Sequence, residues 1–275
     1  MTRSGRPLAG DRDTTHSALT NLYEPGNALA KPPTELKIFF DDGRIADLAQ
    51  TYRQKQSGVR TGGRAVVISA GPPGAGKTAA LDSLQLKGYR RIDPDEAKDL
   101  VLRAASMEGL LEYRNQHLLP DGKPVGLREL APHIHEYSNR VTDLVRAAAL
   151  TAGENVIIDG TLSWEPLVGQ YIDELDRAGY EGLEVVAVEA PLEVALIRAK
   201  QRWWHGRLHE TLGGRFISEQ VIRALYTTAQ QSVCESNARL LAERAGDELG
   251  RGQLNRFDVS DPEGRPQLTA RTTFE

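Results

Sequence analysis

The chain has 275 residues, 40% of them hydrophobic and 26% charged, which suits one large core or one core with appended segments. Its formal net charge of −4, from 34 basic and 38 acidic residues, argues against a surface built to wrap nucleic acid. No apolar run reaches the ~18 residues of a membrane span, residues 1–20 lack an apolar signal segment, and Cys234 is the only cysteine, so we expect a cytoplasmic protein without a membrane span or a disulfide.

Residues 1–60 are predicted to form a flexible leader and short helices. Up to about residue 34 the chain is rich in Gly, Pro, Thr, Asp and Ala, which is typical of a mobile or loosely docked segment. Residues 33–56 show a weak helical pattern that the turn signal Asp41-Asp42-Gly43 interrupts. Two short helices beside the main domain are therefore expected there.

Residues 61–245 carry the pattern of an α/β domain. Short apolar, β-branched runs predict strands at 65–70, 89–92, 156–159 and 183–189. Helical patterns lie at 77–86, 94–107, 127–151, 165–178, 191–205 and 218–245. This alternation predicts three layers around a mainly parallel sheet, whose strands end at one common edge where ligands bind.

Three further segments complete the predicted organisation. In the helix at 127–151 a buried stripe is expected at Tyr137, Val141, Leu144, Val145 and Ala148. Segment 108–128 has no clear period, and a connection of that length suggests a substrate lid. Residues 246–275 contain two strand-like runs around a Pro-Glu-Gly turn and are predicted to pack on the same domain as a hairpin or edge strand.

Residues 71–78 read GPPGAGKT, a complete match to the phosphate-binding pattern G-x-x-x-x-G-K-[ST], between a predicted strand and a predicted helix. In that setting consecutive backbone N–H groups cradle phosphate oxygens at the positive end of the helix. The pattern predicts a P-loop kinase or NTPase fold that binds ATP and Mg²⁺, with Lys77 at the β- and γ-phosphates and Thr78 at the metal. The predicted nucleotide ligands are Gly71, Pro72, Pro73, Gly74, Ala75, Gly76, Lys77 and Thr78.

Carboxylates follow two of the predicted strands. The second strand runs into Asp93-Pro94-Asp95, where a small-molecule kinase needs a group that orients the acceptor hydroxyl and takes its proton. We expect Asp93 to cap the next helix and Asp95 to act as the base. Asp159 ends the third strand, before Gly160 and Thr161, and is placed for the Mg²⁺ shell or a substrate hydroxyl; a strand-end turn is the alternative.

Arginines supply the remaining charge, because phosphoryl transfer spreads negative charge over oxygens that a guanidinium can stabilise. Arg198 and Arg202 lie four residues apart on one predicted helix, and Arg215 follows Gly213-Gly214 on a flexible segment. From composition alone, a solvated basic face is the alternative. No N-K-x-D signature is present, which disfavours a GTPase.

Taken in order, these elements resemble the zeta toxin family, the kinases of epsilon/zeta toxin–antitoxin systems. The resemblance covers about residues 65–222. It rests on GPPGAGKT, IDPDEAK at 92–98, YSNRVTD at 137–143, VIIDGT at 156–161, and an arginine helix followed by a second arginine. The resemblance implies ATP- and Mg²⁺-dependent phosphorylation of the 3′-hydroxyl on the sugar of UDP-N-acetylglucosamine, and a protein antitoxin that blocks the ATP site.

The resemblance also assigns roles to individual residues. It makes Lys77 and Thr78 the ATP and metal contacts, Asp95 the catalytic aspartate, and Arg202 and Arg215 the phosphate-binding arginines. Asp143 and Asp159 stand where family members have substrate-binding glutamates, one methylene longer, and Thr161 follows in the same motif. Arg198 is expected to add a nucleotide contact.

Two other functions remain open from the sequence. The same chemistry could act on another acceptor, such as a pyridine dinucleotide, a nucleotide or an RNA end, although an RNA end calls for a more basic groove lined with aromatic residues. The chain could also be a non-catalytic ATP-binding partner module. A nucleotide-sugar kinase acting as a toxin is the leading prediction, and nucleic acid is not an expected partner.

Overall fold

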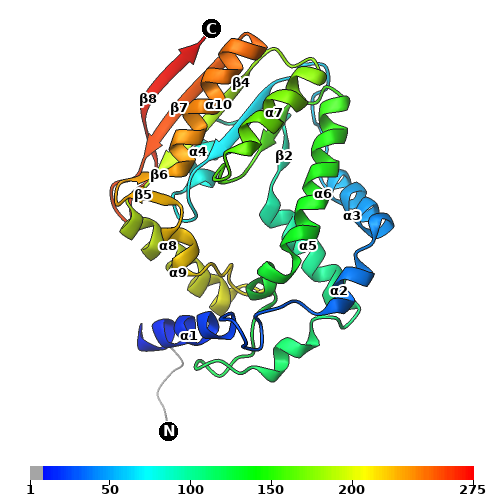
Figure 1. Ribbon diagram of the computed structural model, residues 1–275, viewed down its shortest axis with the longest axis vertical. Coiled ribbons are helices and arrows are strands. Elements are labelled where there is room, and N and C mark those ends of the chain that lie inside the picture. The colour runs from blue at the N-terminus through cyan, green and yellow to red at the C-terminus, as the bar shows by residue number, and fades with distance from the viewer. Residues whose placement is uncertain (1–8) are drawn as a thin grey trace.

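The computed structural model describes residues 9–275 and contains a six-stranded sheet in the order β2-β3-β1-β4-β7-β8, which lies in the upper half of Figure 1. The strands are β1 (Val66–Ala70), β2 (Arg90–Ile92), β3 (Val156–Ile158), β4 (Leu183–Glu189), β7 (Gly252–Asp258) and β8 (Gln267–Phe274). All neighbouring strands pair in parallel except β7 and β8, which form an antiparallel hairpin. The predicted α/β class, the mainly parallel sheet and the C-terminal hairpin are confirmed.

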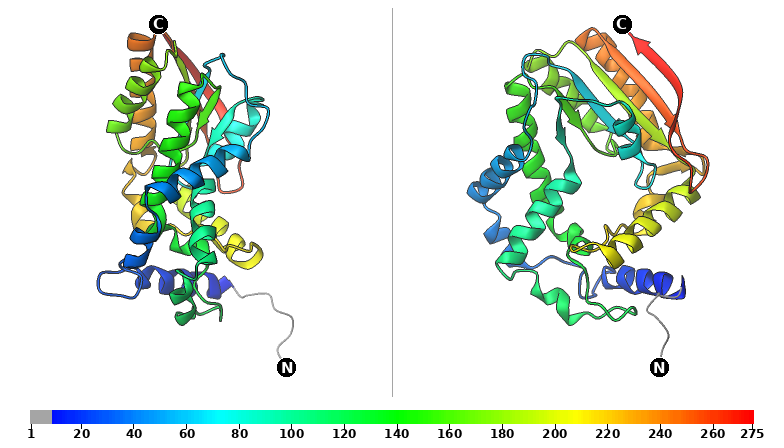
Figure 2. Two further views of the ribbon diagram at one scale, coloured as in Figure 1. Left: turned by 90° about the vertical axis from the view of Figure 1, so that its right-hand side faces the viewer. Right: turned by 180° about the vertical axis from the view of Figure 1, so that it is seen from behind.

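Side chains of alternate residues in β1 enter two different cores. Val66 and Ile68 join the larger core, to which α7 (Pro166–Arg177) and α10 (Val233–Leu249) contribute. Val67 joins a smaller core with Ala80 and Leu81 of α4 (Lys77–Ser83) on the opposite face. This alternation follows from the two-residue period of a strand that is covered on both sides. Figure 2 shows α4 on the face that is hidden in Figure 1.

Two long helices carry the chain away from the sheet. The helix α5 (Pro94–Met107) follows β2 and packs on α6 (Ala131–Thr151), and both agree with the predicted ranges apart from the start of α6. A 3₁₀ turn, η2 (Leu127–Leu130), takes the place of the first predicted turn. Of the predicted stripe, Tyr137, Val141 and Val145 are buried but Leu144 is 45% exposed. The buried face is centred further round the helix because α6 packs against both α5 and α3.

The N-terminal region differs from the predicted leader. From Ala9 onward it forms α1 (Ala9–Leu22), α2 (Thr34–Phe39) and α3 (Asp42–Gln54), while residues 1–8 lie outside the described part. Leu19 of α1 is fully buried. The sequence does not reveal this because the partners of α1 are far along the chain: His16 contacts the rings of Trp203 and Phe216. The two short helices expected within 33–56 are present as α2 and α3.

The helix predicted at 218–245 is wrong as a single element. The helix α8 (Leu192–His209) is followed by α9 (Glu219–Arg223), then by the short strands β5 (Tyr226–Thr228) and β6 (Gln231–Ser232), and only then by α10. The β-branched threonines in β5 favour a strand. The hydroxyl of Tyr226 donates to the Ala190 carbonyl, and the buried carboxylate of Glu189 accepts from the Ser232 N–H at 3.0 Å, which fixes the hairpin beside β4.

Segment 108–128 is anchored rather than free. It contains the 3₁₀ helix η1 (Glu112–Gln116) and a bridge between Leu118 and Pro124. The guanidinium of Arg207 on α8, with a side chain only 2% exposed, bonds to Asp121 at 2.7 Å and to Glu129 at 2.6 Å. The Asp121 pair holds the segment against α8, and the Glu129 pair holds η2, which follows it, on the same side chain; this anchoring does not suit a mobile lid.

One core crosses the three predicted segments. A single cluster of buried side chains includes Leu36 from the first, Val141 from the second and Leu254 from the third. The segment boundaries at residues 60 and 245 stay a prediction made from the sequence, since side chains from all three segments pack in this one core. Within residues 9–275, no helix has the length and apolar character needed to cross a bilayer.

Candidate active site

The glycine loop connects β1 to α4 at the carboxyl edge of the sheet. Gly74 and Gly76 have φ values of 88° and 99°, which L side chains rarely adopt. A Cβ atom on Gly74 would lie 2.4 Å from the Ala195 carbonyl oxygen of α8, so glycine is also required by space. Gly76 begins α4 without a side-chain cap. No capping side chain therefore accepts a hydrogen bond from the first N–H groups of the helix, and these groups point into the loop.

Lys77 closes the loop on itself. Its Nζ donates to the Gly71 carbonyl at 2.8 Å and to the Pro72 carbonyl at 3.3 Å. Burial lowers the pKa of Lys77, an effect that the nearby Asp159 and Asp95 oppose and Arg202 reinforces. The side chain of the next residue, Thr78, is exposed. The lysine thus lies in the field of the predicted catalytic groups, beside the surface on which phosphates would sit.

Asp93 and Asp95 lie in different environments at the start of α5, and the predicted cap is confirmed. Asp93 is the N-cap, and its Oδ1 accepts from the Asp95 N–H at 2.8 Å. Burial, together with the charges of Asp159 and Asp95, raises the pKa of Asp93 to about 6. Burial also disfavours ionisation of Asp95, but Lys98, Arg215 and Arg202 outweigh it and lower the pKa of Asp95. Asp95 is therefore a carboxylate ringed by cations.

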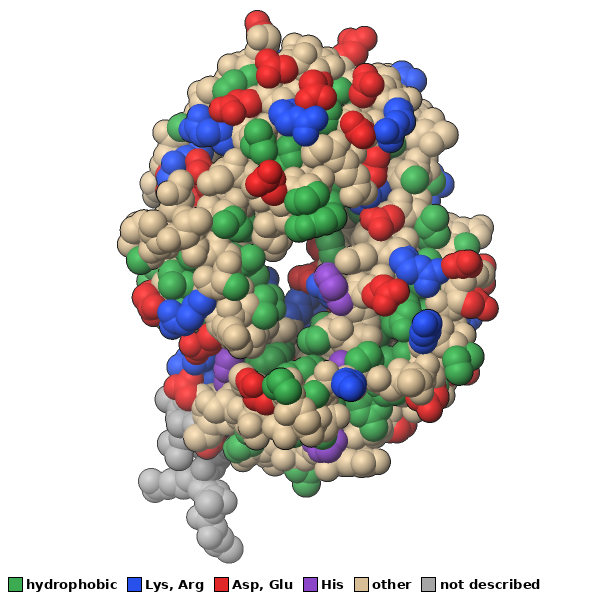
Figure 3. Space-filling model, viewed as in Figure 1, with side chains coloured by type: hydrophobic (Ala, Val, Ile, Leu, Met, Phe, Trp, Pro, Cys, Tyr) green, Lys and Arg blue, Asp and Glu red, His purple; other side chains and the backbone are tan. Residues whose placement is uncertain are grey.

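Three of the predicted catalytic residues line one small pocket, of about 50 Å³, between α5, α8 and the segment after α8; Lys77, the fourth, is not among its lining residues. Asp95, Arg202 and Arg215 all lie in its wall, and Arg215 Nη1 is 3.0 Å from Asp95 Oδ2. The structure therefore brings these three residues together. In the space-filling view, the molecule has an opening through its middle, with charged and histidine side chains at the rim (Figure 3).

Arg202 differs from the other arginines of this region. Within residues 9–275 it makes no hydrogen bond and no ion pair, although burial in the surrounding protein lowers the pKa of its guanidinium. Arg202 is nevertheless an exposed residue, and its side chain is accessible to solvent. Because this exposed guanidinium makes no ion pair in the described chain, its donors are available to a negatively charged ligand. Arg202 is therefore the group in the pocket that is most clearly prepared for a negatively charged ligand.

Asp159 is buried at the end of β3 and is already engaged. Its Oδ1 accepts from the Ser69 hydroxyl at 2.6 Å, and its Oδ2 accepts from Arg91 at 2.5 Å. Thr161, two residues later, binds the glycine loop through its carbonyl, which accepts from the Gly71 N–H at 3.0 Å. These contacts tie the end of β3 to the end of β1.

Asp143 lies apart from this group. It is on α6, its side chain is 56% exposed, and its Oδ1 pairs with Arg146 at 3.0 Å. Asp143 is not among the residues that line the pocket with Asp95. The hydrogen bonds that Arg198 makes go to main-chain carbonyls, two of them in the glycine loop.

The pocket contains residues that the sequence did not single out. Lys98 lies 3.3 Å from Asp95 one turn along α5, and Arg128 binds both oxygens of Asp99 at 2.7 Å. A signal existed for Lys98 and Asp99, because residues three and four after Asp95 share its helix face. Arg128 had no such signal, since it reaches the pocket from η2 through tertiary packing.

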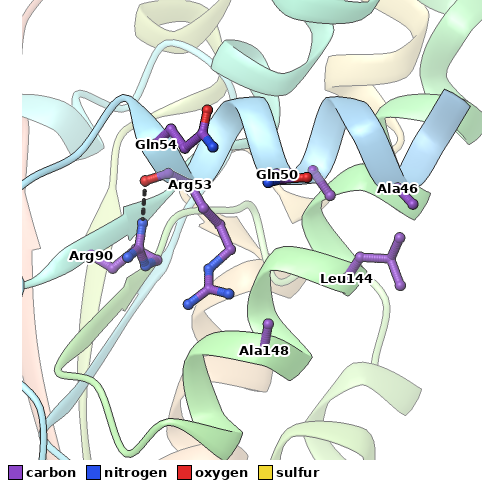
Figure 4. Close-up of a pocket in the computed structure, with 8 residues that line it drawn as sticks. Ala46, Gln50, Arg53, Gln54, Arg90, Leu144 and Ala148 are labelled. Atoms are coloured by element: carbon purple, nitrogen blue, oxygen red, sulfur yellow. Dashed lines mark hydrogen bonds between the residues drawn. The ribbon is translucent and has the colours of Figure 1, made fainter.

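A larger cavity lies elsewhere. It has a volume of about 500 Å³ and opens between α3 and α6, beside Arg53, Arg90, Leu144 and Ala148 (Figure 4). Its arginines belong to a structural network, because Arg90 and Arg53 both bind the buried Glu154, and Arg90 donates to the Arg53 carbonyl at 3.0 Å. None of the predicted site residues lines it, so size alone does not mark the functional site.

Comparison with known proteins identifies the family. Residues 49–246 match the family model described as Zeta toxin. The chain belongs to the zeta toxin family. The resemblance read from the ordered motifs is thereby confirmed, and this zeta toxin family member has the predicted P-loop kinase fold.

A curated relative shares a shorter stretch with this zeta toxin family member. It is the calmodulin calcium-dependent NAD kinase of Arabidopsis thaliana, 32% identical over 109 residues. The match covers 39% of this chain and 20% of the relative, so the chain spans about a fifth of that protein's length.

Solved structures share the fold of this zeta toxin family member. A structure from the PezAT chromosomal toxin–antitoxin system of Streptococcus pneumoniae has a TM-score of 0.51 at 15% identity and covers 78% of each chain. The AvrRxo1-ORF1:-ORF2 complex with ATP has a TM-score of 0.50 at 17% identity, over 98% of this chain and 74% of that one. At these identities the likeness concerns the fold.

Proposed function

We propose that the protein transfers the γ-phosphoryl group of ATP to a hydroxyl of a nucleotide-sugar substrate. The observation that carries this proposal is the unpartnered Arg202 in one pocket with Asp95 and Arg215, where Asp95 and Arg202 are near enough to Lys77 of the glycine loop to affect its pKa. A module that only bound ATP would need the loop but not this group. The ATP-bound neighbour of the same fold supports the choice of nucleotide.

Residues 71–78 would hold the phosphates, through the N–H groups of the loop and the Lys77 ammonium. Thr78 and Asp159 would hold Mg²⁺ together with those phosphates. Ser69 and Arg91 each bond to one oxygen of Asp159 and would hold this carboxylate in a fixed orientation. Residues 9–275 contain no group of three His, Cys, Asp or Glu side chains suited to a metal, which fits an ion held largely by phosphate and water.

Asp95 would accept the proton of the acceptor hydroxyl while the hydroxyl oxygen bonds to the γ-phosphorus. The bond between the γ-phosphorus and the oxygen that bridges it to the β-phosphate breaks, and ADP leaves. A carboxylate with a lowered pKa is ionised at neutral pH and ready to take that hydrogen bond. Arg202 and Arg215 would neutralise the charge that develops on the transferred group. Such preorganised charge supplies much of the acceleration in phosphoryl transfer.

The acceptor that we propose first is UDP-N-acetylglucosamine, phosphorylated at the 3′-hydroxyl of its sugar. Its support is membership in the zeta toxin family, together with carboxylates at 143 and 159 where the family has substrate-binding glutamates. The pairing of Asp143 with Arg146 means that the substrate would have to compete for this carboxylate or reach it through water.

A pyridine dinucleotide is the second candidate acceptor. It is favoured by the 32% identity to an NAD kinase, which exceeds the identity to either solved structure. The chemistry at Asp95, Arg202 and Arg215 would be the same, because both acceptors present a sugar hydroxyl to the γ-phosphate.

Mass spectrometry after incubation with ATP, Mg²⁺ and each acceptor separately tests both candidates. The proposal expects one added phosphoryl group on UDP-N-acetylglucosamine, at the 3′ position by NMR. Phosphorylation of NAD but not of UDP-N-acetylglucosamine would identify the second candidate as the acceptor. Asp95→Asn is the matched control, since it should retain ATP binding and lose transfer. Undiminished transfer by this variant would refute the role of Asp95.

We also propose a protein antitoxin that covers the ATP site. Its support comes from the two structural neighbours: one belongs to a system called toxin–antitoxin, and the other is a complex of two proteins. An antitoxin of this kind should compete with ATP. Binding of the partner that is insensitive to saturating ATP would argue for a different surface.

A further inference from the structure

The β7–β8 turn, residues 259–266, lies against the glycine loop although it is far from it in sequence. Pro266 Cγ is only 3.0 Å from where a Cβ atom of Gly76 would be. The turn begins beside β4, where the Val259 N–H donates to the Glu189 carbonyl at 2.9 Å. The family match ends at residue 246, so this contact brings a segment outside the match to the predicted nucleotide site.

Arg198 is the link between the turn and the loop. Its Nε donates to the Pro262 carbonyl at 3.0 Å and its Nη2 donates to the Gly264 carbonyl. Its Nη1 donates to the carbonyls of Gly74 and Ala75, each at 3.4 Å. One guanidinium therefore holds two backbone segments that are about 190 residues apart, as a planar five-donor group can.

The sheet order shows which part of a nucleotide the turn would meet. Asp95 and Asp159 follow β2 and β3, which lie on one side of β1, whereas the turn follows β7, on the other side. A triphosphate held in the loop after β1, with its γ end toward Asp95, must extend its nucleoside end toward β4 and β7. On α8 the order is the same, with Arg198 at the loop and Arg202 one turn farther, in the pocket with Asp95.

We infer that the turn 259–266 forms a wall of the nucleoside half of the ATP site and that Arg198 is the positioning residue that fixes it there. The inference rests on the proposed use of ATP and adds to it a part of the chain beyond the family match. The turn would contact the purine nucleoside and leave the phosphates to the glycine loop. Arg198 would act through the turn rather than as a direct phosphate ligand.

Calorimetric titration of the full chain with ATP and with inorganic tripolyphosphate, both with Mg²⁺, separates these contributions. Arg198→Gln removes the donors that hold the turn and should raise the Kd for ATP about tenfold, since several hydrogen bonds position that wall. The Kd for tripolyphosphate, which has no nucleoside, should stay within about twofold. Arg177→Gln, on the 73% exposed side chain of α7, is the matched control and should change neither.

Equal weakening of both ligands by Arg198→Gln would mean that the substitution only distorts the glycine loop, and it would overturn the inference, as would no weakening of either. Pro266→Gly gives an independent test, because it loosens the turn while leaving the donors of Arg198 in place; it too should affect ATP selectively. If the unaltered chain binds tripolyphosphate and ATP with the same Kd, this inference fails but the proposed function does not. If it binds neither, the proposed function itself fails.

Discussion

At the scale of single residues, two arginines on α8 show how differently one side-chain type can be used. Arg202 has no hydrogen-bond or ion-pair partner within the described chain, whereas Arg207, five residues later, is 2% exposed and paired with two carboxylates. A charge without a partner contributes little to the folded state, whereas a buried paired charge is costly to remove. Their substitutions should therefore separate function from stability.

Arg202→Gln should lower the rate of phosphoryl transfer by about 10³-fold, because a guanidinium at the transferring group contributes on that scale. The free energy of unfolding should change by less than about 0.5 kcal/mol, since no hydrogen bond or ion pair is lost. Initial rates with the accepted substrate and urea unfolding of the same sample measure the two effects. A stable variant with normal turnover would remove Arg202 from the mechanism.

Arg207→Gln should have the opposite effect. It leaves the carboxylates of Asp121 and Glu129 without their cation, the second of them fully buried, and should lower the free energy of unfolding by about 3–5 kcal/mol. Urea unfolding measures this, and Arg202→Gln serves as the control on the same helix. A loss below ~1 kcal/mol would show that the pairs contribute little to holding segment 108–128.

Asp93 gives the protein a measurable pH dependence. Its pKa is raised from 3.8 to about 6 in the folded state, chiefly by burial. Between these values the folded chain holds this proton more tightly than the unfolded chain does, so the contribution of Asp93 to stability falls as the pH rises through about 6. Asp93→Asn keeps a good N-cap without the charge and should raise the free energy of unfolding at pH 7 by on the order of 2–3 kcal/mol.

The comparison of Asp93→Asn with the unaltered chain should be made at pH 4 and at pH 7. The stabilisation should be large at pH 7 and nearly absent at pH 4, and histidine contributions cancel because both proteins carry the same histidines. Equal stabilisation at both pH values would mean that packing, and not the shifted titration of Asp93, is responsible.

At the scale of elements, helix α1 is tied to the segment that carries Arg215. His16 contacts the rings of Trp203 and Phe216, each with ring centroids at 5.1 Å, and Phe216 follows Arg215 directly. His16→Ala should therefore loosen residues 213–217 and speed their amide hydrogen exchange by about tenfold, because local opening follows lost buried contacts. Unchanged exchange there would show that the rest of the core holds Arg215 without α1.

The elements predicted best from the sequence were those defined by local chemistry. Helix α5 begins with the Asp93 cap and Pro94, and its bounds agree residue for residue with the predicted range. The glycine loop and the strands before and after it follow from their pattern in the same way. Elements whose stability depends on distant partners were missed or merged, as with α1, which packs on α8, and with β5 and β6, which depend on Glu189 and Ala190.

The same division applies to the site. Asp95, Arg202 and Arg215 could be named from motif spacing, and the structure places them in one pocket. The sequence could not show that Asp143 would pair with Arg146, or that Arg198 would bind main-chain carbonyls. Those outcomes depend on which of several nearby partners a long side chain reaches, and that is fixed only by the packing of helices on one another.

At the scale of the whole molecule, nucleotide binding should stabilise the entire chain, because one core joins the sheet to the N-terminal helices and the C-terminal hairpin. Mg²⁺–ATP at a hundred times its Kd should add about 2.7 kcal/mol to the free energy of unfolding and raise Tm by roughly 5–10 °C. Lys77→Ala removes the charge at the β- and γ-phosphates and should abolish most of the shift. Thermal unfolding of both proteins with and without Mg²⁺–ATP measures it, and an equal shift in the two would place the nucleotide outside the glycine loop.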